Sequence, residues 1–150
     1  MALDIRTVRF DDFLEVVLSG SYDMQEAIDR FPHVLSSCRF TGVSKVLVDF
    51  RDLAGTPAAT EKILYALGIR EHYWHYLAVG GHTIQFAYVG KEPAVSTYEP
   101  GLELAQETNI PISLFTTVDK AFDWLGVCPY HTGSYVVPLV TIGGTMLSDR

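Results

Sequence analysis

Two histidines close together in one segment are the first residues to weigh for chemistry. His72 and His75 lie three positions apart, and His82 follows shortly after. On a helix this spacing puts two imidazoles on one face, where they could ligate a metal ion together. No cysteine or carboxylate stands at a recognised spacing to complete such a site. We therefore predict polar histidines in an aromatic-rich strip, with no metal and no other cofactor.

Nucleophile and phosphate-binding motifs are weak or missing. Cys128 precedes His131 by three positions, but no further residue supports a catalytic cysteine, and the chain has no Gly-x-Ser-x-Gly sequence. The segment Gly90-Lys91-Glu92 lacks the spaced glycines and the Lys-Ser/Thr ending of a phosphate loop. The sequence therefore predicts no catalytic residues and a chain that is not an enzyme.

Three carboxylates near one predicted loop leave two interpretations open. Asp49, Asp52 and Glu61 could form an acid–base pair at that loop. Salt bridges with Arg51 or Lys62 explain the same residues equally well. An enzyme would have to bring such groups together in one pocket.

An aromatic strip is a stronger candidate for binding than for catalysis. Tyr73, Trp74, His75 and Tyr76 follow one another, and Tyr65 lies earlier in the same segment. Tyrosine and tryptophan combine an apolar ring with a polar tip, which suits both core edges and interfaces. Tyr73 and Trp74 could pack in the core, but consecutive helical residues cannot all point inward. We predict that Tyr65, Tyr73, Trp74 and Tyr76 provide a surface for a partner or ligand.

Composition narrows the class of protein. The 150 residues carry a formal net charge of −7, which argues against a nucleic-acid partner because such proteins cluster Lys and Arg. The N-terminal residues show no signal-peptide pattern, and no apolar run approaches the roughly 20 residues of a membrane helix. Two cysteines, Cys38 and Cys128, are too few for a disulfide framework. These features predict one soluble, cytoplasmic domain.

Hydrophobic periodicity predicts an alternation of strands and helices. The opening hairpin has a turn at Asp11-Asp12, and Asp23 caps the first helix, which ends at Thr41-Gly42. The predicted strands are Ile5–Phe10, Phe13–Leu18, Lys45–Phe50, Thr83–Val89 and Ile112–Phe115. The predicted helices run from Asp23 to Thr41, from about 58 to 79, from Pro93 to Asn109 with a break at Pro100-Gly101, and from Val118 to Leu125. On the second helix we expect an inner face made of Ala59, Ile63, Ala66, Leu67, Arg70, Tyr73, Trp74 and Leu77.

The last 25 residues follow a different pattern. The segment from Tyr135 to Ile142 is apolar and β-prone, although the domain pattern is complete at Leu125. We predict a domain over residues 1–125 and a C-terminal arm over 126–150. This arm would pack on its own domain or on a second copy of the chain.

The order of elements resembles the STAS fold of bacterial anti-sigma-factor antagonists. Val46-Leu47-Val48-Asp49-Phe50 is similar to the central strand of that family, and Phe86-Ala87-Tyr88-Val89-Gly90 to the next strand. Residues 112–125 resemble its closing strand and helix. The resemblance, which covers about residues 5 to 125, implies an α/β fold, a STAS-like mixed β-sheet with crossover helices and an N-terminal β-hairpin; the extra C-terminal arm lies outside it.

The same comparison of motifs shows a departure at the regulatory site. Regulatory members carry an Asp-Ser-Ser/Thr-Gly turn whose first serine is phosphorylated, and that position falls on Ala58. Thr56 or Thr60 could take over, since a phosphate is favoured at a helix N-terminus. Thr56 could instead be a simple N-cap followed by Pro57. We predict an interaction or switch loop that includes Asp52, Gly55, Thr56 and Thr60.

Three functions remain open at this point. The resemblance favours a non-catalytic regulatory module that binds a protein partner, including itself as a homodimer. The alternative is a domain for a small apolar molecule or lipid, related in fold to CRAL-TRIO domains, which requires an apolar cavity beside the second helix. The third is an enzyme using His72, His75 and Asp52.

Overall fold

A computed structural model describes residues 3–55, 57–127 and 137–138 of the chain. It contains a six-stranded mixed sheet with the strand order β5-β4-β3-β2-β1-β6. β1 pairs antiparallel with β2, whereas β2 through β5 are mutually parallel. The strands are β1 (Leu3–Arg9), β2 (Leu14–Ser21), β3 (Lys45–Ala54), β4 (Gln85–Val89), β5 (Ile112–Phe115) and β6 (Val137–Pro138).

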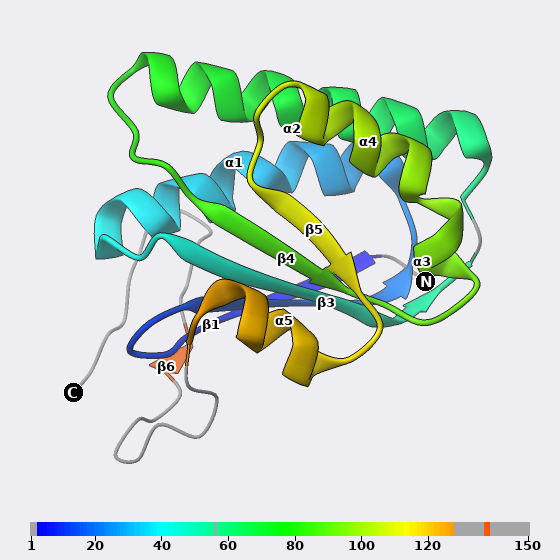
Figure 1. Ribbon diagram of the computed structural model, residues 1–150, viewed down its shortest axis with the longest axis horizontal. Helices are drawn as coiled ribbons and strands as arrows, with labels where there is room; N and C mark the ends of the chain where they lie inside the picture. Colours follow the sequence, from blue (N-terminus) through cyan, green and yellow to red (C-terminus); the bar gives the residue numbers. More distant parts are fainter. Residues whose placement is uncertain (1–2, 56, 128–136, 139–150) are drawn as a thin grey trace.

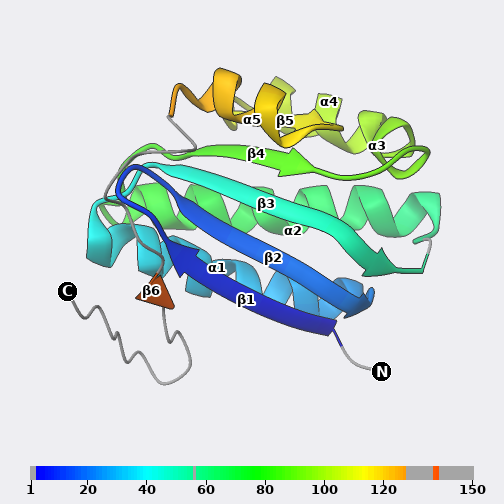
Figure 2. The ribbon, with the colours of Figure 1, turned by 90° about the horizontal axis from the view of Figure 1, so that it is seen from below.

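The helices lie on both faces of this sheet (Figures 1 and 2). The parallel strands follow one another across the sheet in sequence order, so right-handed crossovers place their helices on the same face. Helix α5 follows the last parallel strand and packs on the opposite face, against β4 and β5. The helices are α1 (Met24–Thr41), α2 (Ala59–Ala78), α3 (Ala94–Thr97), α4 (Glu99–Glu107) and α5 (Val118–Leu125).

β3 is covered on both faces, as its nearly continuous apolar sequence predicts. Val46 and Val48 point into the larger core, which is shared with α1, α2 and α4. Leu47 points the other way, into a smaller core that contains Ala121 and Leu125 of α5. Alternation along one strand therefore supplies both cores.

Local sequence determines both ends of α1. The carboxylate of the N-cap residue Asp23 accepts a hydrogen bond from the N–H of Glu26 at 3.0 Å. At the other end Gly42 adopts a φ of 80°, and its N–H donates to the carbonyl of Cys38. Glycine takes this left-handed conformation without steric cost, so the predicted start and end are both confirmed.

The predicted range of α2, about 58 to 79, is confirmed, but its predicted cap and the predicted break near Pro100 are wrong. α2 begins at Ala59 with Ala58 as its N-cap, so neither a Thr56 cap nor Pro57 as first helical residue fits. The helical segment before β5 divides at Tyr98, because Pro100 fits the first turn of α4, where its missing N–H costs nothing.

The predicted arm is described at two residues. Val137 and Pro138 pair with Arg9 and Val8 on the outer edge of β1. The rest of the arm, with Cys128 and His131, lies outside the described residues. Within the described ranges, no helix is long and apolar enough to cross a membrane.

Candidate binding site

The predicted switch loop lies at the carboxyl end of β3. Asp52, Ala54 and Gly55 are exposed there, and Gly55 turns the chain with a φ of 97°. Thr60 is the second residue of α2 and is also exposed. Thr56 lies outside the described residues. The loop and the start of α2 therefore present two accessible polar side chains, Asp52 and Thr60, near the carboxyl end of β3.

Glu61 organises the first turn of α2. Its Oε1 accepts a hydrogen bond of 2.9 Å from the N–H of Ala58, which satisfies one of the free donors at the helix start. Ala58 has no side-chain oxygen to cap the helix in return. A negative side chain in the first turn also stabilises the positive end of the helix dipole.

Four large apolar side chains of α2 are partly exposed, Ile63 and Leu64 near the start of the helix and Trp74 and Leu77 near its end, and we call them the α2 stripe. Their exposed fractions are 39%, 49%, 44% and 38%, although all four side chains are large and apolar. The guanidinium of Arg70 lies 4.8 Å from the ring centre of Trp74 and covers part of it. Our expectation that Ile63, Trp74 and Leu77 belong to the inner face is therefore wrong. The inner face consists of Lys62, Ala66, Ile69, Tyr73 and Tyr76.

Tyr73 and Tyr76 are core residues, so they cannot form the predicted partner surface. Tyr73 is 2% exposed, and its hydroxyl accepts a hydrogen bond from the N–H of Ile84 at 3.1 Å. The Tyr76 hydroxyl lies 3.3 Å from Nδ1 of His82, whose Nε2 contacts the carbonyl of Val43 at 2.9 Å. Both phenols therefore connect α2 to the segment before β4. Of the predicted aromatic surface, Trp74 remains exposed.

The groups proposed for an enzyme do not converge. Asp52 precedes α2, whereas His72 lies 13 residues after its first residue, about 20 Å along the helix axis. Asp49 instead forms a two-point ion pair with Arg51, with distances of 2.9 and 2.8 Å. Burial raises the pKa of Asp49, but hydrogen bonds and the charge of Arg51 outweigh it and lower the pKa below its usual value. In the described part of the chain, no group of three His, Cys, Asp or Glu residues could hold a metal ion.

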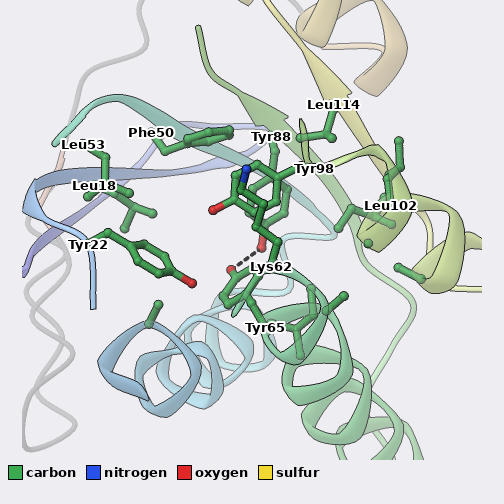
Figure 3. Close-up of a pocket in the computed structure, with 16 residues that line it drawn as sticks. Leu18, Tyr22, Phe50, Leu53, Lys62, Tyr65, Tyr88, Tyr98, Leu102 and Leu114 are labelled. Carbon is green, nitrogen blue, oxygen red and sulfur yellow. Dashed lines mark hydrogen bonds between the residues drawn. The ribbon is translucent and has the colours of Figure 1, made fainter. Parts of the chain in front are cut away.

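Beneath the loop, an apolar pocket opens between α2, α4 and the carboxyl ends of β2 and β3 (Figure 3). Its space for water-sized molecules is about 60 Å³. In sheets with parallel strands, ligands bind preferentially at this end of the strands. The lining residues are Leu18, Tyr22, Ala27, Phe50, Leu53, Lys62, Tyr65, Ala66, Ile69, Tyr88, Tyr98, Gly101, Leu102, Ala105, Ile112 and Leu114.

Four tyrosines bring hydroxyls into this apolar space. Figure 3 shows Tyr22, Tyr65, Tyr88 and Tyr98 converging from four different parts of the chain. The hydroxyls of Tyr65 and Tyr88 form a hydrogen bond of 2.8 Å. Burial is the main cause that raises the pKa of all four, to about 12 for Tyr98. All four are therefore neutral phenols that can donate a hydrogen bond at physiological pH.

Lys62 supplies a buried positive charge to the same wall. The residue is 5% exposed, and its ammonium group donates to Oγ1 of Thr97 and lies 5.0 Å from the ring centre of Tyr98. The sequence suggested a salt bridge from Lys62 to Asp49, Asp52 or Glu61. Among the described residues Lys62 forms no such bridge, and Asp49 pairs with Arg51 instead.

The arrangement of strands and helices is similar to that of solved anti-sigma factor antagonists. One, from Mycobacterium paratuberculosis, has a TM-score of 0.53 and 16% identity, and the match covers 84% of this chain and 96% of that one. The chain has a STAS-like fold. The unphosphorylated anti-sigma factor antagonist SpoIIAA also matches, with a TM-score of 0.48, 18% identity and coverage of 85% and 99%. No protein-family model and no curated protein matches the sequence.

The STAS-like fold brings together pocket residues that sequence reasoning missed. Tyr65 was predicted for a ligand surface, but Tyr22, Tyr88 and Tyr98 come from separate elements, and no spacing connects them. Lys62 did carry a usable signal. It begins the row of positions 62, 66, 69, 73 and 76, whose other members are apolar or aromatic, so its position predicts a buried cation.

Proposed function

We propose that this chain is a non-catalytic, STAS-like regulatory module that binds a protein partner through the loop after β3 and the α2 stripe. The observation that carries the proposal is the stripe itself, four large apolar side chains of one helix that remain partly exposed. The likeness to an anti-sigma factor antagonist supports a regulatory role for the fold. Large apolar side chains left exposed among polar residues are typical of interaction sites.

The α2 stripe has the composition of a binding surface. Leu64 and Trp74 are each nearly half exposed, and burying the remaining area of each side chain in a partner would contribute about 1 kcal/mol. Tryptophan is also enriched among the residues that dominate binding energies. The acidic charge of the chain favours a protein partner over nucleic acid.

The loop provides a place where binding could be regulated. Thr60 is exposed in the first turn of α2, close to the free N–H groups of the helix start. A phosphate on Thr60 would add negative charge beside Glu61 and next to the α2 stripe. The mass of the denatured protein from its own host tests this part, and an increment of one phosphate on the peptide containing Thr56 or Thr60 is the supporting result.

A second copy of the chain is one possible partner. The homodimer that we propose would bury the α2 stripe of both copies, and the arm would contribute contacts beside β1. Light scattering over a concentration series measures this directly. A mass of one chain at all concentrations would remove self-association and leave a different protein as the partner. We also propose that the module acts in the cytoplasm.

Two matched variants test the docking surface. Leu64→Lys places a charge in the α2 stripe, whereas Phe40→Lys places one on the exposed end of α1, where Phe40 is 73% exposed. Lysine is a good helix former, so both variants should fold. The unmodified chain is first used to capture a partner from host extract, and the partner is purified. Its affinity should then be at least tenfold lower for the Leu64 variant and less than about twofold lower for the Phe40 variant. Equal losses, or no protein whose binding depends on Leu64, would contradict the proposal.

A further inference from the structure

The pocket beneath the loop contains a positive charge without a negative partner. Lys62 is 5% exposed, and among the described residues its ammonium group contacts a threonine hydroxyl and an aromatic ring but no carboxylate. An ammonium group has three donors, and one is used by Thr97. Buried charges in proteins are normally paired, since an isolated charge in apolar surroundings is costly. The site is therefore electrostatically incomplete.

The Tyr22 hydroxyl is a second incomplete group in the same pocket. Its oxygen is buried and forms no hydrogen bond of regular geometry within the described residues, although it lies close enough to the Tyr98 hydroxyl for the two groups to interact. Burial, followed by the neighbouring hydroxyl of Tyr98, raises its pKa, so the group remains a donor. Tyr65 and Tyr88 form a regular hydrogen bond with each other, whereas the irregular contact between Tyr22 and Tyr98 leaves the Tyr22 hydroxyl to be satisfied by a ligand.

We propose that this pocket binds a small aliphatic monocarboxylic acid in its ionised form. The carboxylate would accept hydrogen bonds from the ammonium group of Lys62 and the hydroxyl of Tyr22. Its hydrocarbon part would lie against Leu18, Leu53 and Leu102, which line the same space. A charged, hydrogen-bonding head with an apolar body matches the two kinds of wall (Figure 3).

The volume of the pocket limits the length of the acid. A water molecule needs roughly 10–15 Å³ of such space, so about 60 Å³ corresponds to four to six atoms of similar size. Butanoate has six non-hydrogen atoms and fits this limit. A ten-carbon acid exceeds it and would have to leave most of its chain outside. The proposed ligand class is therefore short-chain.

Binding of the acid in the pocket does not depend on the proposed protein partner. The acid would contact Lys62, Tyr22 and the pocket walls, whereas the protein partner would contact the α2 stripe. The two sites nevertheless share the first turns of α2, since Lys62 lies between Glu61 and Ile63. An occupied pocket would hold this turn in one position and could alter the adjacent docking surface.

Butanoate and butanamide form a matched pair of probes, because they share their shape and differ in charge. We would follow the backbone amide signals of the full ¹⁵N-labelled chain by NMR during titration with each, up to about 20 mM. The expected result is shifts centred on Tyr22, Lys62 and Tyr98, with butanoate binding at least about tenfold more tightly than butanamide. Decanoate should bind no more tightly than butanoate.

Variants identify the groups responsible. Lys62→Met keeps the length of the side chain and should cost about tenfold in butanoate affinity while changing butanamide affinity by less than about twofold. Tyr22→Phe should weaken butanoate binding by about threefold or more. Lys91→Met, on an exposed lysine outside the pocket, is the control and should change neither.

Three results would overturn the inference. The first is the absence of shifts at pocket residues with every probe, and the second is equal affinity for the acid and the amide. The third is an unchanged preference for the acid in both pocket variants. If Lys62→Met fails to fold, the comparison of the two probes on the unmodified chain and the Tyr22→Phe variant still decides the question.

Discussion

Removing the hydroxyls of Tyr65 and Tyr88, one at a time and then together, measures how much their hydrogen bond in the pocket wall contributes to the stability of the fold. The two oxygens lie 2.8 Å apart and connect α2 to β4. Their rings are also in edge-to-face contact, with centres 6.4 Å apart. Phenylalanine keeps both rings and removes the hydrogen bond alone, so the substitutions isolate the polar contribution.

The expected energies follow from the cost of leaving one hydroxyl without its partner. Each single change, Tyr65→Phe or Tyr88→Phe, loses a hydrogen bond and leaves a buried oxygen unsatisfied, which costs about 1–3 kcal/mol. The double change removes both oxygens and leaves no unsatisfied group, so it should cost no more than one single change. The double variant should therefore be about 2 kcal/mol more stable than the sum of the single effects predicts.

Urea unfolding followed by tryptophan fluorescence provides the assay, since Trp74 and Trp124 lie on opposite sides of the sheet. In thermal unfolding of a chain of this length, a loss of 1 kcal/mol in the free energy of unfolding corresponds to a Tm lower by about 2–4 °C. Additive effects within about 0.5 kcal/mol would show that the two hydroxyls do not depend on each other. That result would refute the described geometry of the pocket wall.

Three further changes test the sheet. Asp49→Asn should lower the free energy of unfolding by about 0.5–1 kcal/mol at neutral pH, because the ionised Asp49 pairs with Arg51. The pKa of Asp49 is lowered in the fold, so the stability difference between the two proteins, measured by urea unfolding across pH, should fade below about pH 4. Glu15→Gln should raise Tm at neutral pH, because burial and then the charge of Asp49 raise the pKa of Glu15 and disfavour its ionised form in the fold; a lower Tm would contradict this. Gly90→Ala should cost about 1–3 kcal/mol, since the new Cβ would lie 2.4 Å from the ring of Phe50, and an unchanged unfolding midpoint would show that the ring moves freely.

The order of elements was predictable because each one carries its own local pattern. The apolar run in β3 and the acidic turn at Asp11-Asp12 depend on neighbouring residues, and both are where the sequence places them. The inner face of α2 was not predictable in the same way. This helix has large apolar residues on nearly all sides, so its periodicity does not distinguish Ile63 from Ile69, although the first is exposed and the second buried.

The pocket depends on contacts between distant parts of the chain. Tyr22 follows β2, Tyr88 belongs to β4, and Tyr98 lies between α3 and α4. No local pattern indicates that three such residues meet, since their meeting results from the crossover connections. Lys62 could have been identified as buried from its position in the inner row of α2, but what it contacts could not.

The proposed function requires that the α2 stripe binds a protein. Site-specific photo-crosslinking in host cells tests it most directly, with a photoreactive side chain in place of Leu64 and, as a control, in place of Phe40. We predict a discrete crosslinked product from position 64 and none from position 40, with either a second copy of the chain or another protein as the attached mass. No product from position 64, or the same products from both positions, would contradict the account.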